Sequence, residues 1–208
     1  MPENRHELYL TPEFASRFDQ IEKATIAGDA RAAQVYEEIV RIMRDLGDGT
    51  EKGHHPLTDK SHGGGGDLRD CTASEFRSHP EAKLDHRLIW RQHPAPQENA
   101  LPIREAVHVG PRHETPGSYE QTLTIIERDP SEQIEANADY GDPAYTGNKS
   151  QAVRGSALDA QHAASLMRAG SVPLAKSRPL SEFDFGSRRT TAGRARTLSG
   201  RNDGPAKS

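Results

Sequence analysis

The chain has 208 residues, of which 33% are apolar and 28% charged, and its net charge is −4 at pH 7. No run of residues approaches the roughly 20 apolar positions that a membrane-spanning helix needs. Leu, Ile, Val and Phe number 34, or 16% of the chain, below the ~20% that marks a well-filled core. The composition excludes a membrane-spanning helix and indicates a folded part joined to a part without a core.

The two parts are expected to meet at Arg128. Residues 1–128 hold 24 of the 34 large apolar residues and carry a net charge of −6. Residues 129–208 hold ten and carry +2, which predicts a low-complexity, mostly disordered extension with a weak helix near 157–169. The end of this extension, 186–208, has six basic residues and one acid. Such a segment is typical of a solvated tail, and it can also bind a polyanion weakly.

The cysteine count and the first residues predict a cytoplasmic protein. Cys71 is the only cysteine, so no intrachain disulfide can form, which suits a reducing compartment. The first ten residues, MPENRHELYL, lack the basic and apolar regions of a signal peptide.

The first fifty residues predict a strand followed by two helices. Residues 6–10 are a short strand candidate, and Thr11, Pro12 and Glu13 form a helix start with an N-cap, a proline at the first helical position and a first-turn acid. Apolar residues then recur at helical spacing and predict helices over 12–26 and 30–46. Two amphipathic helices with a short connection form a helical hairpin.

Three more strands and one helix follow in the pattern. Residues 48–67 have loop composition, and strands are predicted over 68–76, 84–91 and 103–109. A capping-box pattern at 118–121 then begins a short helix. The order β-α-α-β-β-β-α predicts an α+β fold in which the helical hairpin packs on a small antiparallel sheet.

Several segments of this sequence are similar to one known family. DLRDC at 67–71, KLDHRLIWR at 83–91 and IREAVHVGPRHE at 103–114 precede a helix that begins around Tyr119. Together with the element order they resemble the RelE/ParE toxin superfamily, most closely its RelE-like branch, over residues 6–128. The resemblance implies a toxin of a type II toxin–antitoxin pair, with no metal and no organic cofactor. RelE-like members cleave mRNA in the ribosomal A site, and ParE-like members poison gyrase.

The resemblance also implies a catalytic site. Alternation along 84–91 places Arg87 on the strand face opposite Leu88 and Trp90, away from the helix-covered side. Arg87 and Arg112 stand where RelE-like toxins carry two arginines at the scissile phosphate. Tyr119 resembles the tyrosine that stacks on or orients the substrate. Either Glu75 or a nearby histidine is expected to move the proton, and the alternative that the Glu75 carboxylate repels RNA stays open.

Four further residues are expected to bind substrate. His55 lies near the position where another branch of the superfamily carries a glutamate, and Arg77 directly follows the strand predicted over 68–76. His108 and His113 are candidates for proton transfer, since imidazole titrates near neutrality. No metal site is expected, because the histidines at 54, 55 and 62 have no second pair of ligands at a suitable spacing.

The expected function is that of a metal-independent endoribonuclease that cleaves mRNA on the ribosome through the substrate's 2′-hydroxyl. Its expected partners are a cognate antitoxin, mRNA and the ribosome, with no membrane. Two alternatives remain open: a non-nucleolytic ParE-like or degenerate member, and a protein-interaction module that acts by binding. The −6 charge of the first 128 residues favours these alternatives, as do Ala73 and Glu75 where RelE-like members can carry lysines.

Overall fold

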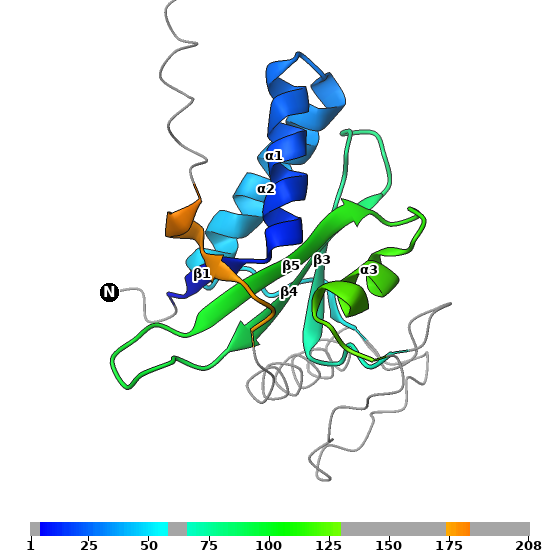
Figure 1. Ribbon diagram of the computed structural model, residues 1–208. Coiled ribbons are helices and arrows are strands. Elements are labelled where there is room, and N and C mark those ends of the chain that lie inside the picture. Colours follow the sequence, from blue (N-terminus) through cyan, green and yellow to red (C-terminus); the bar gives the residue numbers. More distant parts are fainter. Residues whose placement is uncertain (1–4, 58–65, 130–173, 184–208) are drawn as a thin grey trace, which may run out of the picture.

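The computed structural model describes residues 5–57, 66–129 and 174–183, and Figure 1 shows their arrangement. A mixed sheet lies between a helical hairpin on one face and a short helix on the other (Figure 1). In chain order the elements are β1 (Glu7–Leu10), α1 (Pro12–Ile26), α2 (Ala30–Gly47), β2 (His55–Pro56), β3 (Cys71–Phe76), β4 (His86–His93), β5 (Ile103–Pro111), α3 (Ser118–Ile125), β6 (Arg178–Pro179) and the 3-10 helix η1 (Leu180–Glu182).

The α+β fold is confirmed, and the predicted elements follow in the expected order. Two short strands were not predicted: β2, within the segment expected to be a loop, and β6, within the extension. The direction of one strand also differs from the prediction. The strand order is β2-β3-β4-β5-β1-β6, and β3, β4 and β5 form the expected antiparallel meander. However, β1 pairs parallel with β5, so the sheet is mixed rather than antiparallel. Between β1 and β5 the chain forms both hairpin helices and the strands β2, β3 and β4. No tight turn joins these two strands, and the long connection permits parallel pairing.

Local sequence signals fix the starts of both hairpin helices. The Thr11 hydroxyl accepts a hydrogen bond from the Phe14 amide at 3.1 Å and donates one to the Val107 carbonyl at 2.7 Å. The Asp29 carboxylate accepts bonds from the amides of residues 31 and 32 at the start of α2. These caps satisfy amides that have no partner within the helix. The Thr11 bond also fastens the start of α1 to β5.

The core between the helical hairpin and the sheet contains the residues that the apolar pattern predicts. The apolar pattern predicts burial of six side chains, and all are buried: Val35, Ile39, Ile42, Leu88 and Trp90 in this core, and Val107 elsewhere in the sheet. The indole N–H of Trp90 donates to the Ser74 hydroxyl at 3.1 Å, and the Arg104 guanidinium stacks on its ring at 4.8 Å. The only tryptophan of the chain therefore has its polar atom satisfied inside the core.

The opposite face of the sheet carries a smaller apolar cluster under α3. Its buried members are Leu57, Leu68, Cys71, Ala73, Ile89 and Leu123. Because side chains alternate along a strand, Leu88 and Trp90 of β4 face the hairpin, whereas Arg87, Ile89 and Arg91 face α3. The predicted orientation of Arg87, away from the helical hairpin, is therefore confirmed.

The expected boundary at Arg128 leaves out a segment that packs on the sheet. Residues 174–183 run along the edge of β1, where β6 pairs with Tyr9 and Leu10 (Figure 1). Arg128 itself is buried and forms ion pairs with Asp70. The extension thus contributes an edge strand to the fold. The helix expected near 157–169 and the basic end at 186–208 lie outside the described residues.

Candidate functional site

Four of the residues that the resemblance singles out gather at one end of the sheet, on the face that carries α3. Strand register places Glu75 of β3 directly opposite Arg87 of β4, and Arg87 opposite Gly110 of β5. Arg112 follows the last residue of β5, and Tyr119 is the second residue of α3. Four segments that are separate in sequence therefore bring Glu75, Arg87, Arg112 and Tyr119 together, with His55 of β2 at their side. We call these five residues the Glu75 cluster.

The centre of the Glu75 cluster is a single carboxylate oxygen. Glu75 Oε1 lies 3.3 Å from Arg87 Nη2, which donates a hydrogen bond to it. The same oxygen lies 3.3 Å from Arg112 Nε and 3.5 Å from His55 Nε2. The Arg112 contact is an ion pair without hydrogen-bond geometry, since its Nε has no hydrogen-bond partner. Three nitrogen-bearing side chains thus converge on one anionic atom.

Arg87 is covered, which differs from the open face expected for it. Its residue exposure is 6%, and its guanidinium carbon lies 4.8 Å from the centre of the Tyr119 ring. Tyr119 in turn packs on the apolar cluster beneath α3. An aromatic lid over a guanidinium favours the cation through the negative face of the ring. Arg112 is the more accessible arginine, with 34% of its side chain exposed.

Both arginines keep an unused donor. Arg87 Nε and Arg112 Nε are buried, and neither has a hydrogen-bond partner among the described residues. A buried N–H without an acceptor is costly, so each is a place where a further acceptor atom would stabilise the site. The forked guanidinium group matches the spacing of phosphate or carboxylate oxygens. The arrangement can therefore bind an oxyanion.

The remaining predicted site residues lie outside the Glu75 cluster. His108 is buried, with its Nε2 3.0 Å from Glu114 Oε1. His113 is exposed, and Arg77 is exposed and donates to the Pro80 carbonyl in its own turn at 3.3 Å. The structure therefore engages His108 and Arg77 in local contacts rather than with the two central arginines.

A second charged cluster was missed by the sequence analysis. It lies on the same face of the sheet, toward the other end of β5. Arg91 donates to Glu105 Oε2 at 2.8 Å and 2.5 Å and to Asp70 Oδ2 at 3.2 Å. Arg128 forms a fork on Asp70 with bonds of 2.7 Å and 2.8 Å, and His93 Nε2 lies 3.1 Å from Glu105 Oε2. Every charge in this group has an opposite partner, which buried charges require.

The surroundings hold both carboxyls of this buried cluster in the charged form. Burial alone raises the pKa of Glu105, but hydrogen bonds and charge from His93 and Arg91 outweigh it and lower the pKa from 4.5 to about 2. Burial likewise raises the pKa of Asp70, while the bonds and charge of Arg128, followed by those of Arg91, lower it further than burial raises it. Both carboxyls therefore act as anionic anchors of the fold at neutral pH.

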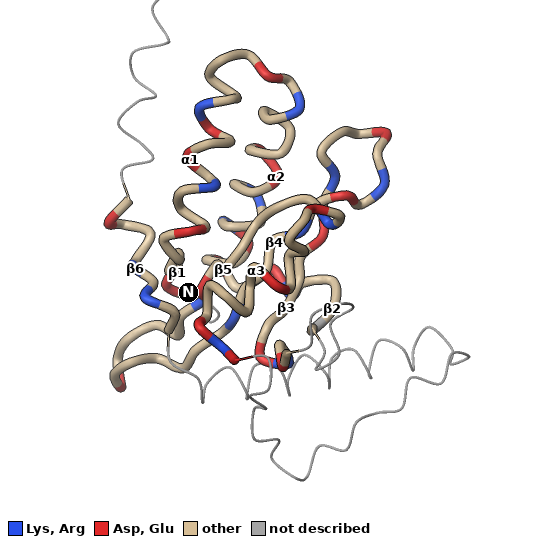
Figure 2. Tube along the Cα trace, turned by 45° about the vertical axis from the view of Figure 1, so that its right-hand side comes forward, with Lys and Arg blue, Asp and Glu red and all other residues tan. Residues whose placement is uncertain are grey.

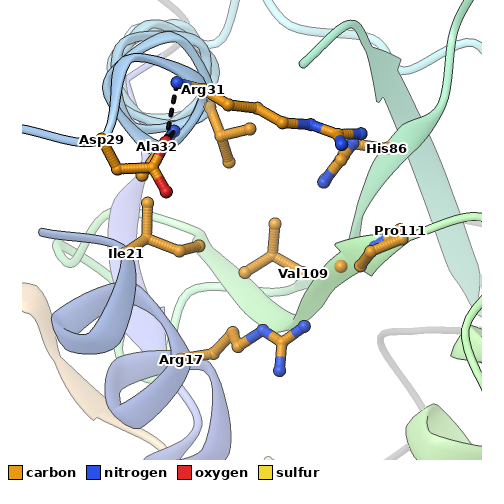
Figure 3. A pocket seen from close by; sticks show the side chains of 10 residues that line it. Arg17, Ile21, Asp29, Arg31, Ala32, His86, Val109 and Pro111 are labelled. Carbon is orange, nitrogen blue, oxygen red and sulfur yellow. Dashed lines mark hydrogen bonds between the residues drawn. The ribbon is translucent and has the colours of Figure 1, made fainter. Parts of the chain in front are cut away.

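A hollow of about 190 Å³ lies behind the Glu75 cluster, on the hairpin face. Arg17, Arg31 and His86 stand around it, with apolar side chains such as Val109 between them (Figure 3). Arg31 Nη2 pairs with Asp85 Oδ2 at 3.2 Å, and Arg17 pairs with a glutamate at 3.4 Å. The guanidinium groups of Arg17 and Arg31 at this hollow are therefore already paired with carboxylates of the chain.

Charge of both signs is spread over the described chain. Lys and Arg positions are interleaved with Asp and Glu positions along α1 and α2 (Figure 2). Within the described ranges, no group of His, Cys, Asp and Glu side chains is arranged to hold a metal ion. No helix in the described part of the chain is long and apolar enough to cross a membrane.

Comparison with protein-family models, curated proteins and solved structures found no match to this chain.

Proposed function

We propose that this chain is a RelE-like toxin, a metal-independent endoribonuclease that cleaves mRNA during translation. The observation that carries the proposal is the convergence of Arg87 and Arg112 on one oxygen of Glu75, under the ring of Tyr119. The family resemblance assigns these side chains to one site, and they are distant in sequence. Their gathering around an anion supports that assignment.

The proposed role of the two arginines is to hold a phosphate in place of the Glu75 carboxylate. Both Nε–H groups are buried and have no hydrogen-bond acceptor among the described residues. The two non-bridging oxygens of a phosphodiester can therefore use donors that the carboxylate oxygen leaves unused. When the 2′-oxygen attacks phosphorus, negative charge grows on the phosphate oxygens. Preorganised guanidinium groups at that position stabilise the transition state more than the ground state.

The proposed reaction breaks the bond between phosphorus and the 5′-oxygen. The 2′-oxygen forms the new bond to phosphorus, and Glu75, once displaced from the arginines, accepts the 2′-hydroxyl proton. Protonated His55, whose Nε2 lies 3.5 Å from the Glu75 carboxylate, supplies a proton to the departing 5′-oxygen. The products are a 2′,3′-cyclic phosphate and a 5′-hydroxyl. Tyr119 offers a ring on which a base adjacent to the cut can stack.

The proposal is tested by induction in a bacterial host, followed by mapping of cellular mRNA ends. Wild-type chain is expected to arrest growth and create new ends. Arg87→Ala and Arg112→Ala should each reduce cleavage roughly a hundredfold, the effect of losing a ~3 kcal/mol electrostatic contact. Arg87→Ala leaves Glu75 its contacts with Arg112 and His55. Arg41→Ala is the matched control, because Arg41 is exposed on α2 and pairs only with acids of its own helix.

The charge of the chain favours a second candidate, a ParE-like or degenerate member that acts by binding a protein. Residues 1–128 carry a net charge of −6, and phosphate contacts gain most from a positive surface. Growth arrest without new mRNA ends would favour this candidate. If the chain neither arrests growth nor cleaves mRNA, the interpretation as a protein-interaction module remains. A cognate antitoxin is part of the toxin proposal, and its co-expression should restore growth.

A further inference from the structure

Residues 174–183, which we call the clasp, pass around the outer edge of the sheet beside β1. Before β6, the clasp crosses the α3 face. There the Ala175 amide donates to Glu105 Oε1 at 2.7 Å and the Ser177 hydroxyl donates to the same oxygen. After β6, Leu180 and Phe183 pack against the core on the hairpin face. The clasp therefore contacts both faces of the sheet and its edge.

Three features of the body recognise the clasp. The buried Glu105 carboxylate accepts hydrogen bonds from the Ala175 amide and from the Ser177 hydroxyl two residues later. The edge of β1 pairs with the next two residues of the clasp, opposite Tyr9 and Leu10. An apolar surface receives Leu180 and Phe183. Backbone pairing at an edge with side-chain seats on either side is how strand addition recognises extended peptides.

The clasp is attached loosely compared with what lies beneath it. None of its ten residues is buried, whereas Glu105 has 0% exposure. Its strand pairs with only half of β1, because the pairing reaches Tyr9 and Leu10 and stops before Glu7 and Leu8. Pro179 has no amide hydrogen to continue the ladder. An extended segment that pairs with all four residues of β1 would gain hydrogen bonds that the clasp does not make.

We propose that β1, Glu105 and the adjoining apolar surface form a binding groove for an extended segment of a partner protein, and that the clasp occupies this groove as an internal competitor. The partner segment carries a free amide, a Ser or Thr two residues later, and apolar residues three and six positions beyond the hydroxyl. This chemistry is the chemistry of the clasp itself. All of the clasp's groove contacts come from ten consecutive residues, so a separate chain can make them.

A labelled synthetic peptide with the sequence of residues 174–183, LAKSRPLSEF, is the probe for this groove. Its binding is measured by fluorescence anisotropy to the full chain and to the full chain with Leu180→Asp and Phe183→Asp, which removes the clasp's apolar seats. The tethered clasp competes at an effective concentration near millimolar. The peptide should therefore bind the double variant at least about tenfold tighter than the wild-type chain.

A peptide with Ser177→Ala is the matched control. It loses one hydrogen bond to a buried carboxylate and should bind the double variant about tenfold more weakly. Equal affinity of the two peptides, or equal affinity of the two proteins, would overturn the proposal. Light scattering on the wild-type chain tests whether a second copy of the chain occupies the groove instead. A concentration-dependent dimer that the double variant abolishes would assign the groove to a second copy and overturn the assignment to a partner protein.

Hydrogen exchange on the wild-type chain keeps the proposal testable if the double variant does not fold. Excess wild-type peptide should displace the clasp from β1 and speed exchange at the clasp amides. The Ser177→Ala peptide should have a weaker effect. Unchanged exchange at the clasp amides at saturating peptide would contradict a displaceable clasp.

Discussion

Glu105→Gln isolates the contribution of the buried charged cluster to stability. The wild-type carboxylate has 0% exposure and accepts bonds from Arg91, Ala175 and Ser177. A lowering of its pKa from 4.5 to about 2 corresponds to roughly 3 kcal/mol of folding free energy at neutral pH. The variant loses this charge and leaves buried Arg91 with Asp70 as its remaining anion. We therefore expect a loss of at least about 3 kcal/mol at pH 7.

The sign of the pH dependence follows from the lowered pKa. The stabilisation is fully present above the unfolded pKa of 4.5, and it is lost as pH falls toward the folded pKa of about 2. Glu105→Gln has no carboxylate at this position, so its stability does not change with the titration of this group. The gap in unfolding free energy between the two proteins should therefore be widest above pH 5 and shrink between pH 4.5 and 2.

Urea unfolding followed by the fluorescence of Trp90 measures this gap. Trp90 is the only tryptophan and is buried, so its emission reports on the core. Glu37→Gln is the matched control, because Glu37 is exposed on α2, and its effect should stay within about 0.5 kcal/mol. A gap between wild type and Glu105→Gln that is constant from pH 6 to pH 2 would refute the argument.

Three other changes test the fold. Gly53→Ala should cost more than about 1 kcal/mol, since Gly53 has a φ of +74° and an added methyl would overlap Thr72; an unchanged melting temperature would contradict this. Arg128→Met removes the two hydrogen bonds of Arg128 to buried Asp70, and it should lower the free energy of unfolding in urea by about 3–5 kcal/mol. An almost unchanged free energy would contradict this and would show that Arg91 alone satisfies Asp70. A chain that ends at residue 173 should melt several degrees below one that ends at residue 183, because it lacks the clasp; equal melting would show the clasp to be dispensable.

The hairpin helices and the strands β1, β3, β4 and β5 could be predicted because their signals are local, whereas the two-residue strands β2 and β6 were not predicted. The caps at Thr11 and Asp29 and the apolar spacing behind them define α1 and α2 within one residue. The parallel direction of β1 could not be predicted in this way, because it depends on where the long connection brings the chain back. The clasp was missed because its two packed apolar residues, Leu180 and Phe183, lie within a long polar extension.

Strand alternation places the candidate site on the correct face but says nothing about what covers that face. It predicts that Arg87 points away from the hairpin, and the structure confirms this. The same alternation places Arg91 on a face that looks solvent-exposed in the sequence. Arg91 is nevertheless buried, because Asp70 and Glu105 neutralise it. Arg128 and the clasp hold these two carboxylates in turn. Charges that neutralise one another across distant segments leave no periodic signal in a single sequence.

The proposal that the Glu75 cluster cleaves RNA through the 2′-hydroxyl is tested most directly on ribosomes that translate a defined message. The cut is first mapped with wild-type chain. A second message then carries a single 2′-deoxynucleotide on the 5′ side of the mapped bond, which removes the proposed nucleophile and nothing else. The proposal predicts that this message stays intact at that bond, whereas the all-ribose message is cut. Cleavage of both messages at the same bond would contradict it.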